Sequence, residues 1–384
     1  MKKSILFATS AIIATGVAGV SAQAIDVELY GQVNKGVVAA NANGDASGAD
    51  ISIVDNDFSS TRFGLRGNQQ LSNGLTASVL LEGELEDNTS NAALVDGAVG
   101  SPNNTTGGSA WQTRHARVGL GGQWGALFLG RTSTASDGVA EIDLAPAQDV
   151  SGSAVDRIGG GIVVEGTNTL SAYADNIDGI GYTGDGNTVG QHESDRRDTV
   201  RFDTPIVNGL QGRIAYSEGE DVDAAVLYNN TFAGFEVAGG VSYVSYGDQA
   251  AVLAGATDAD DAWAITASAK HDSGLSGTIN YGERNFDGLA AGVDNPTSYY
   301  VKLGYQYNNT GFAIDYARND DALVVTDATA TSSELTSYGA YVQQDLGHGV
   351  SASAYYRQIG VERNGVDTAA ADVNVVGVNM RVKF

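Results

Sequence analysis

The chain has 384 residues, of which 51 are glycine, 4 are proline and none is cysteine, and its 46 acidic and 21 basic side chains give a net charge of −25. The lack of cysteine excludes disulfide scaffolds, cysteine-ligated zinc, iron–sulfur clusters and thiol catalysis. The negative charge argues against nucleic acid as a partner, because phosphate contacts need clustered lysines and arginines. A glycine-rich, proline-poor chain without charge-paired helical periods is expected to be built mainly of strands.

The N-terminus has the pattern of a secretory signal peptide. Lys2 and Lys3 precede an uncharged stretch over 5–20, and 21–24 (SAQA) provides a small-residue cleavage site. We therefore predict that residues 1–24 are removed and that 25–384 form one exported domain. An uncleaved membrane anchor is the alternative, but the uncharged stretch is short for a helical span.

Hydrophobic residues recur at every second position in segments spread along the mature chain. Near the C-terminus, for example, Val378, Met380 and Val382 alternate with Asn379 and Arg381. Such alternation places one face of a strand against an apolar phase and the other against water. The pattern predicts sixteen strands, at 26–40, 58–70, 74–88, 110–122, 124–131, 197–204, 208–218, 222–231, 234–247, 260–272, 274–284, 297–308, 311–320, 334–346, 349–361 and 372–384.

The lengths of these strands and of their connections favour a membrane barrel over a soluble sandwich. Most of the strands approach or exceed the ~9–11 residues of a tilted membrane crossing. Short glycine-marked turns alternate with mostly longer loops rich in Asp, Asn, Gly and Ser, which is typical of outer-membrane barrels. Hydrocarbon offers no hydrogen bonds, so a spanning sheet must close on itself. We predict an all-β, antiparallel transmembrane barrel with long extracellular loops.

Several segments resemble those of the general bacterial porins. They are 27–31 (VELYG), similar to the opening strand; 60–67 (STRFGLRG) with 71–75 (LSNGL), similar to the second strand and first periplasmic turn; 114–120 and 129–131, similar to the fourth and fifth strands; and 198–205, similar to the strand after the constriction loop. The resemblance implies a trimeric, sixteen-stranded porin of a Gram-negative outer membrane, in contact with lipid and lipopolysaccharide. It also implies that the barrel-assembly machinery reads the C-terminal Phe384.

The longest connection, within 131–195, is too long for a simple surface loop. In the family, the third loop folds into the lumen and narrows it, so the resemblance implies a constriction loop here. We predict that its carboxylates, at Asp137, Glu141, Asp143 and Asp149, form the acidic side of the pore constriction. The alternative is that these carboxylates are merely solvated, as most loop charges are.

Arginines on the barrel wall are predicted to form the basic side of the constriction. They are Arg62, Arg66, Arg114, Arg131 and Arg201. Arg114 matches a basic position of the family, whereas local alternation favours Arg117 as the inward residue, and a β-bulge would exchange the two. Gln32 stands where the family often has a lysine, which weakens the basic cluster.

These features predict a water-filled channel for passive diffusion of small polar solutes and ions, without catalysis and without a cofactor. The excess of acidic residues predicts a preference for cations, since a pore of one sign concentrates counter-ions. One alternative is a substrate-selective channel lined by inward Tyr30, Tyr300 and Tyr355. A surface adhesin is a further alternative, although the chain shows no repeats of fixed period.

Weaker patterns suggest divalent cations. The acidic, glycine-rich segments 175–179 and 183–187 have oxygen ligands suited to calcium, although their spacing does not match the helix–loop–helix pattern. Asp258, Asp260 and Asp261 could bridge through such ions to anionic lipid headgroups.

Overall fold

The computed structural model describes residues 25–42, 50–85, 89–90, 111–160, 162–165, 168–169, 196–247, 259–286, 289, 292–322, 332–364 and 372–384. The predicted signal peptide, the two predicted calcium segments and Asp258 lie outside these residues. Regular structure in the described part is almost entirely strand, with one short 3-10 helix, η1 (Val155–Arg157). No helix among the described residues is long and apolar enough to cross a membrane.

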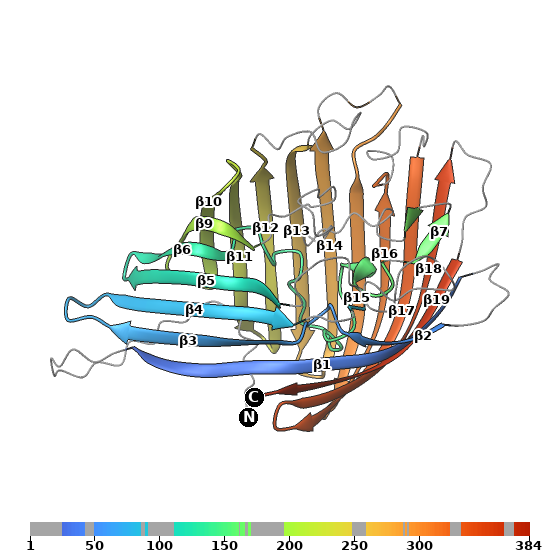
Figure 1. The fold of residues 1–384 in the computed structure, drawn as a ribbon, viewed down its shortest axis with the longest axis horizontal. Coiled ribbons are helices and arrows are strands. Elements are labelled where there is room, and N and C mark those ends of the chain that lie inside the picture. Colours follow the sequence, from blue (N-terminus) through green and yellow to red (C-terminus); the bar gives the residue numbers. More distant parts are fainter. Residues whose placement is uncertain are drawn as a thin grey trace.

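Sixteen antiparallel strands form a closed barrel, which confirms the predicted fold class. Each strand pairs with its neighbours in chain order, and the last returns to pair with the first (Figure 1). The strands are β1 (Asp26–Ala42), β3 (Arg62–Gln70), β4 (Thr76–Leu85), β5 (Trp111–Gly122), β6 (Gly125–Ser133), β9 (Arg196–Asp203), β10 (Leu210–Ser217), β11 (Val222–Phe232), β12 (Phe235–Ser245), β13 (Ala259–His271), β14 (Leu275–Phe286), β15 (Thr297–Tyr307), β16 (Thr310–Asp320), β17 (Ser332–Gly347), β18 (Val350–Asn364) and β19 (Asp372–Lys383). A separate two-stranded ladder joins β7 (Val163–Glu165) and β8 (Asn168–Thr169).

The barrel closes at a seam along β1. On one side, the first residues of β1 pair with β3 and later ones with a short extra strand, β2 (Asp50–Asp55); on the other side, residues from Gln32 onward pair with β19. Phe384 extends the seam by exchanging two backbone hydrogen bonds of 3.0 Å with Gly31. A Cβ at position 31 would lie 2.7 Å from the Phe384 ring, so only glycine fits this closing contact.

Strand β2 lies in a region, 41–57, that the sequence predicts to be a loop, so that prediction is wrong. Ile51 and Ile53 point outward, with exposed fractions of 73% and 71%, and continue the ladder on β1 beyond the point where β3 begins. With only two outward apolar positions between aspartates, the segment is too short for its alternation to stand out from a polar loop.

The outer face of the strands carries mainly apolar side chains, as the alternation predicts. Val27, Leu29, Val378 and Met380 all point away from the lumen, with exposed fractions between 53% and 59%. Outward rings on neighbouring strands also contact one another, at centroid distances of 4.9–5.1 Å; these pairs are Trp263–Tyr281, Tyr281–Tyr299 and Tyr316–Tyr338. Rows of Tyr and Trp on the outer face are typical of the membrane–water interface.

Residues 134–160, called the inner segment below, leave the end of β6 and lie inside the ring of strands (Figure 1). An apolar core forms between this segment and the inner wall; its members from the segment are Ala147, Val150, Val155 and Ile158, and those from the wall include Val38, Leu335, Ile359 and Val375. The third loop is therefore folded into the lumen, and it packs against the wall formed by β15–β19 and β1.

Candidate functional site: a constriction inside the barrel

Apolar contacts hold the first half of the inner segment against β11 and β12. Val139, Ile142 and Leu144 form a buried cluster with Leu227 and neighbouring alanines of these strands. Gly240 leaves room for them, since a Cβ there would lie 3.0 Å from Val139. Because this burial removes apolar surface from water, it fixes the segment on one side of the lumen.

The turn of the inner segment is fitted to two glycines of the wall. Pro146 packs against Gly304 on β15 and Gly311 on β16, and a Cβ at either position would lie 2.4 Å from the proline ring. A larger residue at either position would therefore push the inner segment away from the wall. The two glycines determine how closely the segment approaches the wall.

Asp143 forms a buried ion pair with the wall. Its Oδ2 lies 2.7 Å from Nζ of Lys302, a β15 side chain that is fully buried. The other oxygen accepts hydrogen bonds from the Thr278 hydroxyl at 2.5 Å and from the backbone N–H of Ala145 at 2.8 Å. Asp143 was predicted to line the acidic side of the pore, but here its carboxylate is an anchor with little exposure to solvent.

Asp149 makes a second buried anchor, on β18 and β19. One oxygen lies 2.6 Å from Arg381, and the other accepts hydrogen bonds from Ser351, at 2.8 Å, and from Gln343. The Asp149 side chain is only 4% exposed. Two of the four predicted constriction carboxylates therefore fix the segment to the wall, because burial of their charges is tolerated only when partners compensate it.

The other two predicted carboxylates remain in contact with solvent. Glu141 is 45% exposed and pairs with Arg157 of η1 at 2.5 Å, and Asp137 is partly exposed near the start of the segment. Of the four predicted constriction carboxylates, these two therefore keep substantial contact with solvent.

Arg62 and Arg114 face the lumen on the opposite wall, next to two carboxylates of β4. Arg114 contacts Glu82 at 2.7 Å and Glu84 at 2.5 Å, and Arg62 lies 3.9 Å from Glu82. The register of β4 against β5 shifts at this point: Glu82 lies opposite His115 and Gly83 opposite Thr113, so no residue of β4 lies opposite Arg114. The extra residue of this bulge lets Arg114 turn inward even though Arg117 also faces the lumen.

Arg117 and Arg201 form a second basic group on β5 and β9. Both guanidinium groups lie over the ring of Phe128, at 4.3 and 5.0 Å from its centroid. Arg201 also binds Asp203 through two hydrogen bonds, of 2.9 and 3.1 Å. The choice between Arg114 and Arg117, which the sequence leaves open, is resolved by placing both on the inner wall.

Arg131 is a correction to the predicted basic wall. It shares the outward face of β6 with Leu127 and Leu129, which are 42% and 57% exposed, and its Nε donates to the backbone carbonyl of Thr113 at 2.8 Å. The sequence placed it inside only because it ends the fifth predicted strand. Arg66 does face inward by parity, but it lies near the short-turn end and pairs with exposed Glu28 at 3.0 Å, away from the inner segment.

Sequence reasoning missed four cations that contact the inner segment or line its surroundings. They are Arg157, Lys302, Arg381 and Lys383. Arg381 and Lys383 occupy inward positions of an alternating strand, so parity was a sufficient signal for them. Lys302 likewise lies at an inward position of alternating β15, whereas Arg157 lies in the inner segment, where no alternation applies, and is recognisable only through its partner Glu141.

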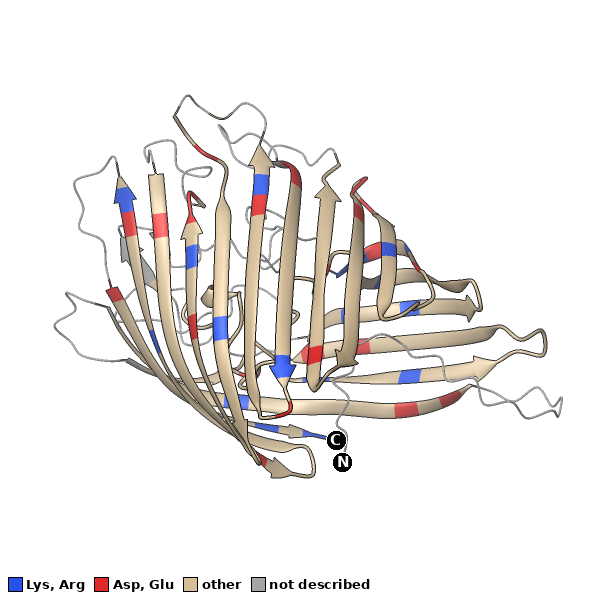
Figure 2. Ribbon diagram, turned by 180° about the vertical axis from the view of Figure 1, so that it is seen from behind, with Lys and Arg blue, Asp and Glu red and all other residues tan. Residues whose placement is uncertain are grey.

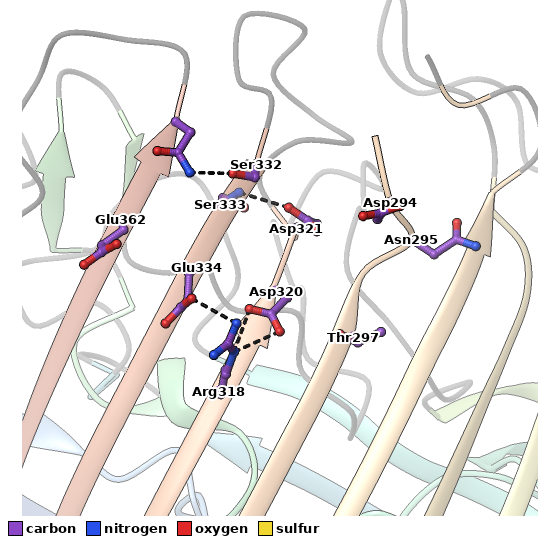
Figure 3. Close-up of a pocket in the computed structure, with 11 residues that line it drawn as sticks. Asp294, Asn295, Thr297, Arg318, Asp320, Asp321, Ser332, Ser333, Glu334 and Glu362 are labelled. Carbon is purple, nitrogen blue, oxygen red and sulfur yellow. Dashed lines mark hydrogen bonds and ion pairs between the residues drawn. The ribbon is translucent and has the colours of Figure 1, made fainter. Parts of the chain in front are cut away.

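A separate acidic pocket lies at the rim of the barrel, between the ends of β15–β18 (Figure 3). Arg318 bridges Asp320 and Glu334, at 2.8 and 3.0 Å. Burial raises the pKa of nearby Asp321, and the carboxylates of Asp320 and Asp294 act in the same direction. Nothing in this cluster indicates a bound ion: across the described residues, no group of three or more His, Asp or Glu side chains has a metal-holding arrangement.

The remaining divalent-cation expectation concerns Asp260 and Asp261, of which Asp261 accepts a hydrogen bond of 2.7 Å from Asn285.

A closed sixteen-stranded barrel with its own third connection folded into the lumen defines an outer-membrane barrel of the channel-forming class. The model of the Gram-negative porin family matches residues 8–364, and the chain belongs to that family. It is accordingly a protein of the Gram-negative outer membrane. Comparison with the sequences of curated proteins gave no significant match.

Solved structures share the fold at low sequence identity. An anion-selective porin from Comamonas acidovorans is 19% identical, with a TM-score of 0.61 over 94% of this chain and 100% of that chain. OmpT of Vibrio cholerae is 12% identical, with a TM-score of 0.56 over 95% and 99%, and a variant of the Rh. blastica porin is 14% identical, with a TM-score of 0.53 over 94% and 100%. At these identities the likeness concerns the fold alone.

Proposed function

We propose that the mature chain forms a water-filled channel for passive diffusion of small hydrophilic solutes and ions. The observation that carries this proposal is the inner segment: it is anchored on one side of the lumen, through Asp143 and Asp149, opposite a wall of inward arginines. A sixteen-stranded barrel is wide enough to leave an aqueous path beside such a segment. The family and the structural neighbours support a channel for small solutes.

The proposal includes transport without catalysis and without a cofactor, and assembly as a homotrimer. OmpT of Vibrio cholerae, whose structure in trimer form has a TM-score of 0.54 to this chain, supports the oligomeric state by likeness of fold. Contacts with lipopolysaccharide, recognition of Phe384 by the barrel-assembly machinery and calcium binding in the outer loops belong to the proposal on the strength of sequence alone.

The net charge of the chain is a poor guide to whether the channel prefers cations or anions, because many of its carboxylates are paired. Glu141, Asp143 and Asp149 each pair with a cation, so they add little negative charge to the water path. Figure 2 shows that acidic and basic residues are interspersed along the strands: neither sign of charge is confined to one side of the barrel. We propose a weak preference for anions, set by Lys383, which is unpaired among the described residues, in place of the cation preference that the net charge suggests. The Comamonas porin, described as anion-selective, supports this direction.

The row of inward tyrosines does not favour a substrate-selective channel. Tyr300 and Tyr355 belong to the apolar core beneath the inner segment, with exposed fractions of 3% and 6%, and the hydroxyl of Tyr30 on β1 donates to Glu82 on β4, two strands away. Side chains used in this way do not line a continuous path for a sugar.

Two measurements test the proposed function. Liposomes that contain the purified protein should swell in small sugars and should not swell in oligosaccharides, and the absence of swelling in any solute contradicts the channel. Reversal potentials in a KCl gradient near 1 M test the selectivity, because the field of the outer loops is screened beyond ~3 Å there, compared with ~10 Å at 0.1 M. A potential of cation sign at high salt contradicts the anion preference.

A further inference from the structure

Cationic side chains line the seam of the barrel in register. Gln32 on β1 is paired with Arg62 of β3 on one side and with Lys383 of β19 on the other, so these three inward residues form one row across adjacent strands. In the next inward row, Asn34 is paired with Arg381. The amide nitrogen of Gln32 donates to the backbone oxygens of Ser59 and Ser60, and Gln32 itself carries no charge that would neutralise the cations on either side of it.

A pocket of about 250 Å³ lies between this seam and the inner segment. Arg381 and Lys383 line it from β19. The inner segment contributes Arg157 and three carboxylates, each of which already has a cationic partner: Glu141 with Arg157, Asp143 with Lys302 and Asp149 with Arg381. Phe58 provides an apolar surface: its ring packs beside Gly152, where a Cβ would lie 3.2 Å away, and the Arg157 guanidinium lies 5.8 Å from its centroid. Because each lining carboxylate is paired with a cation, the charge left over in the pocket is that of Lys383, and it lies in the same pocket as one flat apolar contact.

The charges on the β19 side of the pocket do not cancel. Asp149 binds Arg381 and compensates its charge, whereas Lys383 forms no ion pair with any described residue and is exposed at the short-turn end of the lumen. The Arg381 side chain keeps 15% of its surface exposed and lines the same pocket. One uncompensated ammonium group beside a partly exposed guanidinium is suited to a single carboxylate, which can accept charge-assisted hydrogen bonds from both.

We propose that this pocket binds small monocarboxylates with an apolar body, the carboxylate lying against Lys383 and Arg381 and the apolar body against Phe58. This inference rests on the proposed function in that it names a class of solute held during passage. A solute with an ammonium group in place of the carboxylate is repelled by the same cations, and acetate lacks the apolar body that Phe58 contacts.

Blocking of ion current tests the site, with benzoate as the probe. In planar bilayers at 0.1 M KCl, benzoate is expected to reduce the current at lower concentrations than acetate, and benzylammonium is expected not to reduce it over the same range. Lys383→Gln should raise the half-blocking concentration of benzoate about tenfold, the effect of losing one charge-assisted contact. Phe58→Leu should remove most of the advantage of benzoate over acetate.

Lys270→Gln is the matched control, because Lys270 also lies on an inward position at the short-turn end, on β13, and does not line the pocket. Equal weakening of the block in Lys270→Gln and Lys383→Gln overturns the site in favour of a general lumen charge, and block that is unchanged in Lys383→Gln overturns it outright. Saturation-transfer NMR of benzoate on the detergent-solubilised protein reads binding without any current. Binding without current would contradict the proposed channel, and current without binding would contradict this site.

Discussion

Replacement of Asp143 by Asn tests whether the inner segment is held by its buried ion pair. The substitution keeps the shape of the side chain and an oxygen that can accept from Thr278 and Ala145, but it removes the charge opposite Lys302. The Lys302 side chain has no exposed surface, so its ammonium group would remain buried without a carboxylate. The perturbation therefore isolates the electrostatic part of the anchor.

The expected loss is about 3–5 kcal/mol, the range found when one partner of a buried ion pair is removed. Glu141→Gln is the matched control: it makes the same chemical change two residues away, at a side chain that is 45% exposed, and it should cost at most about 1 kcal/mol. Adding Lys302→Met to Asp143→Asn removes the unpaired charge and should restore most of the stability.

The assay combines denaturant unfolding of the detergent-solubilised barrel with limited proteolysis and conductance. Asp143→Asn should lower the unfolding free energy, make the inner segment susceptible to cleavage, and increase the current because the segment no longer holds its position. An Asp143→Asn protein that matches Glu141→Gln in unfolding free energy, cleavage and current would refute the reasoning.

Three further substitutions test separate parts of the site. Gly304→Val should displace the inner segment, since its Cβ would lie 2.4 Å from Pro146, and the change should appear as altered single-channel conductance. Arg114→Met should lower the free energy of unfolding by about 1–3 kcal/mol, because Glu82 and Glu84 both lose a buried charged donor. Arg131→Gln should leave the reversal potential unchanged, because that side chain lies on the outer face of β6.

Two of these substitutions have a matched comparison. Gly277→Ala adds a methyl group at an outward glycine, where a Cβ meets its nearest neighbour at 3.5 Å, and should not alter conductance. Arg201→Gln removes an inward arginine and should shift the reversal potential. A shift in Arg131→Gln as large as that in Arg201→Gln would contradict the assignment of faces on β6.

The fold was predictable from the sequence because its main determinant is local. Period-two alternation identifies the face of each strand, as Val378 and Met380 show, and strand length and turn spacing indicate membrane crossing. The exception was β2, where Ile51 and Ile53 alone carried the pattern. A strand this short is defined by the ladder it joins on β1, which the local sequence does not encode.

The site was predictable only in part, because it depends on contacts between distant residues. The parity of β6 places Arg131 outside, and attention to its neighbours Leu127 and Leu129 would have shown this. By contrast, nothing local distinguishes Asp143, which anchors the segment, from Glu141, which faces solvent. Their difference comes from Lys302, which lies 159 residues from Asp143 along the chain.

Single-channel recording of the purified protein tests the central claim most directly, namely that the barrel surrounds a water path that the inner segment narrows without closing. We predict ohmic current steps that close in three equal decrements, one for each subunit, and a larger unit step in Asp143→Asn. A folded, membrane-inserted protein that passes no current would contradict the account.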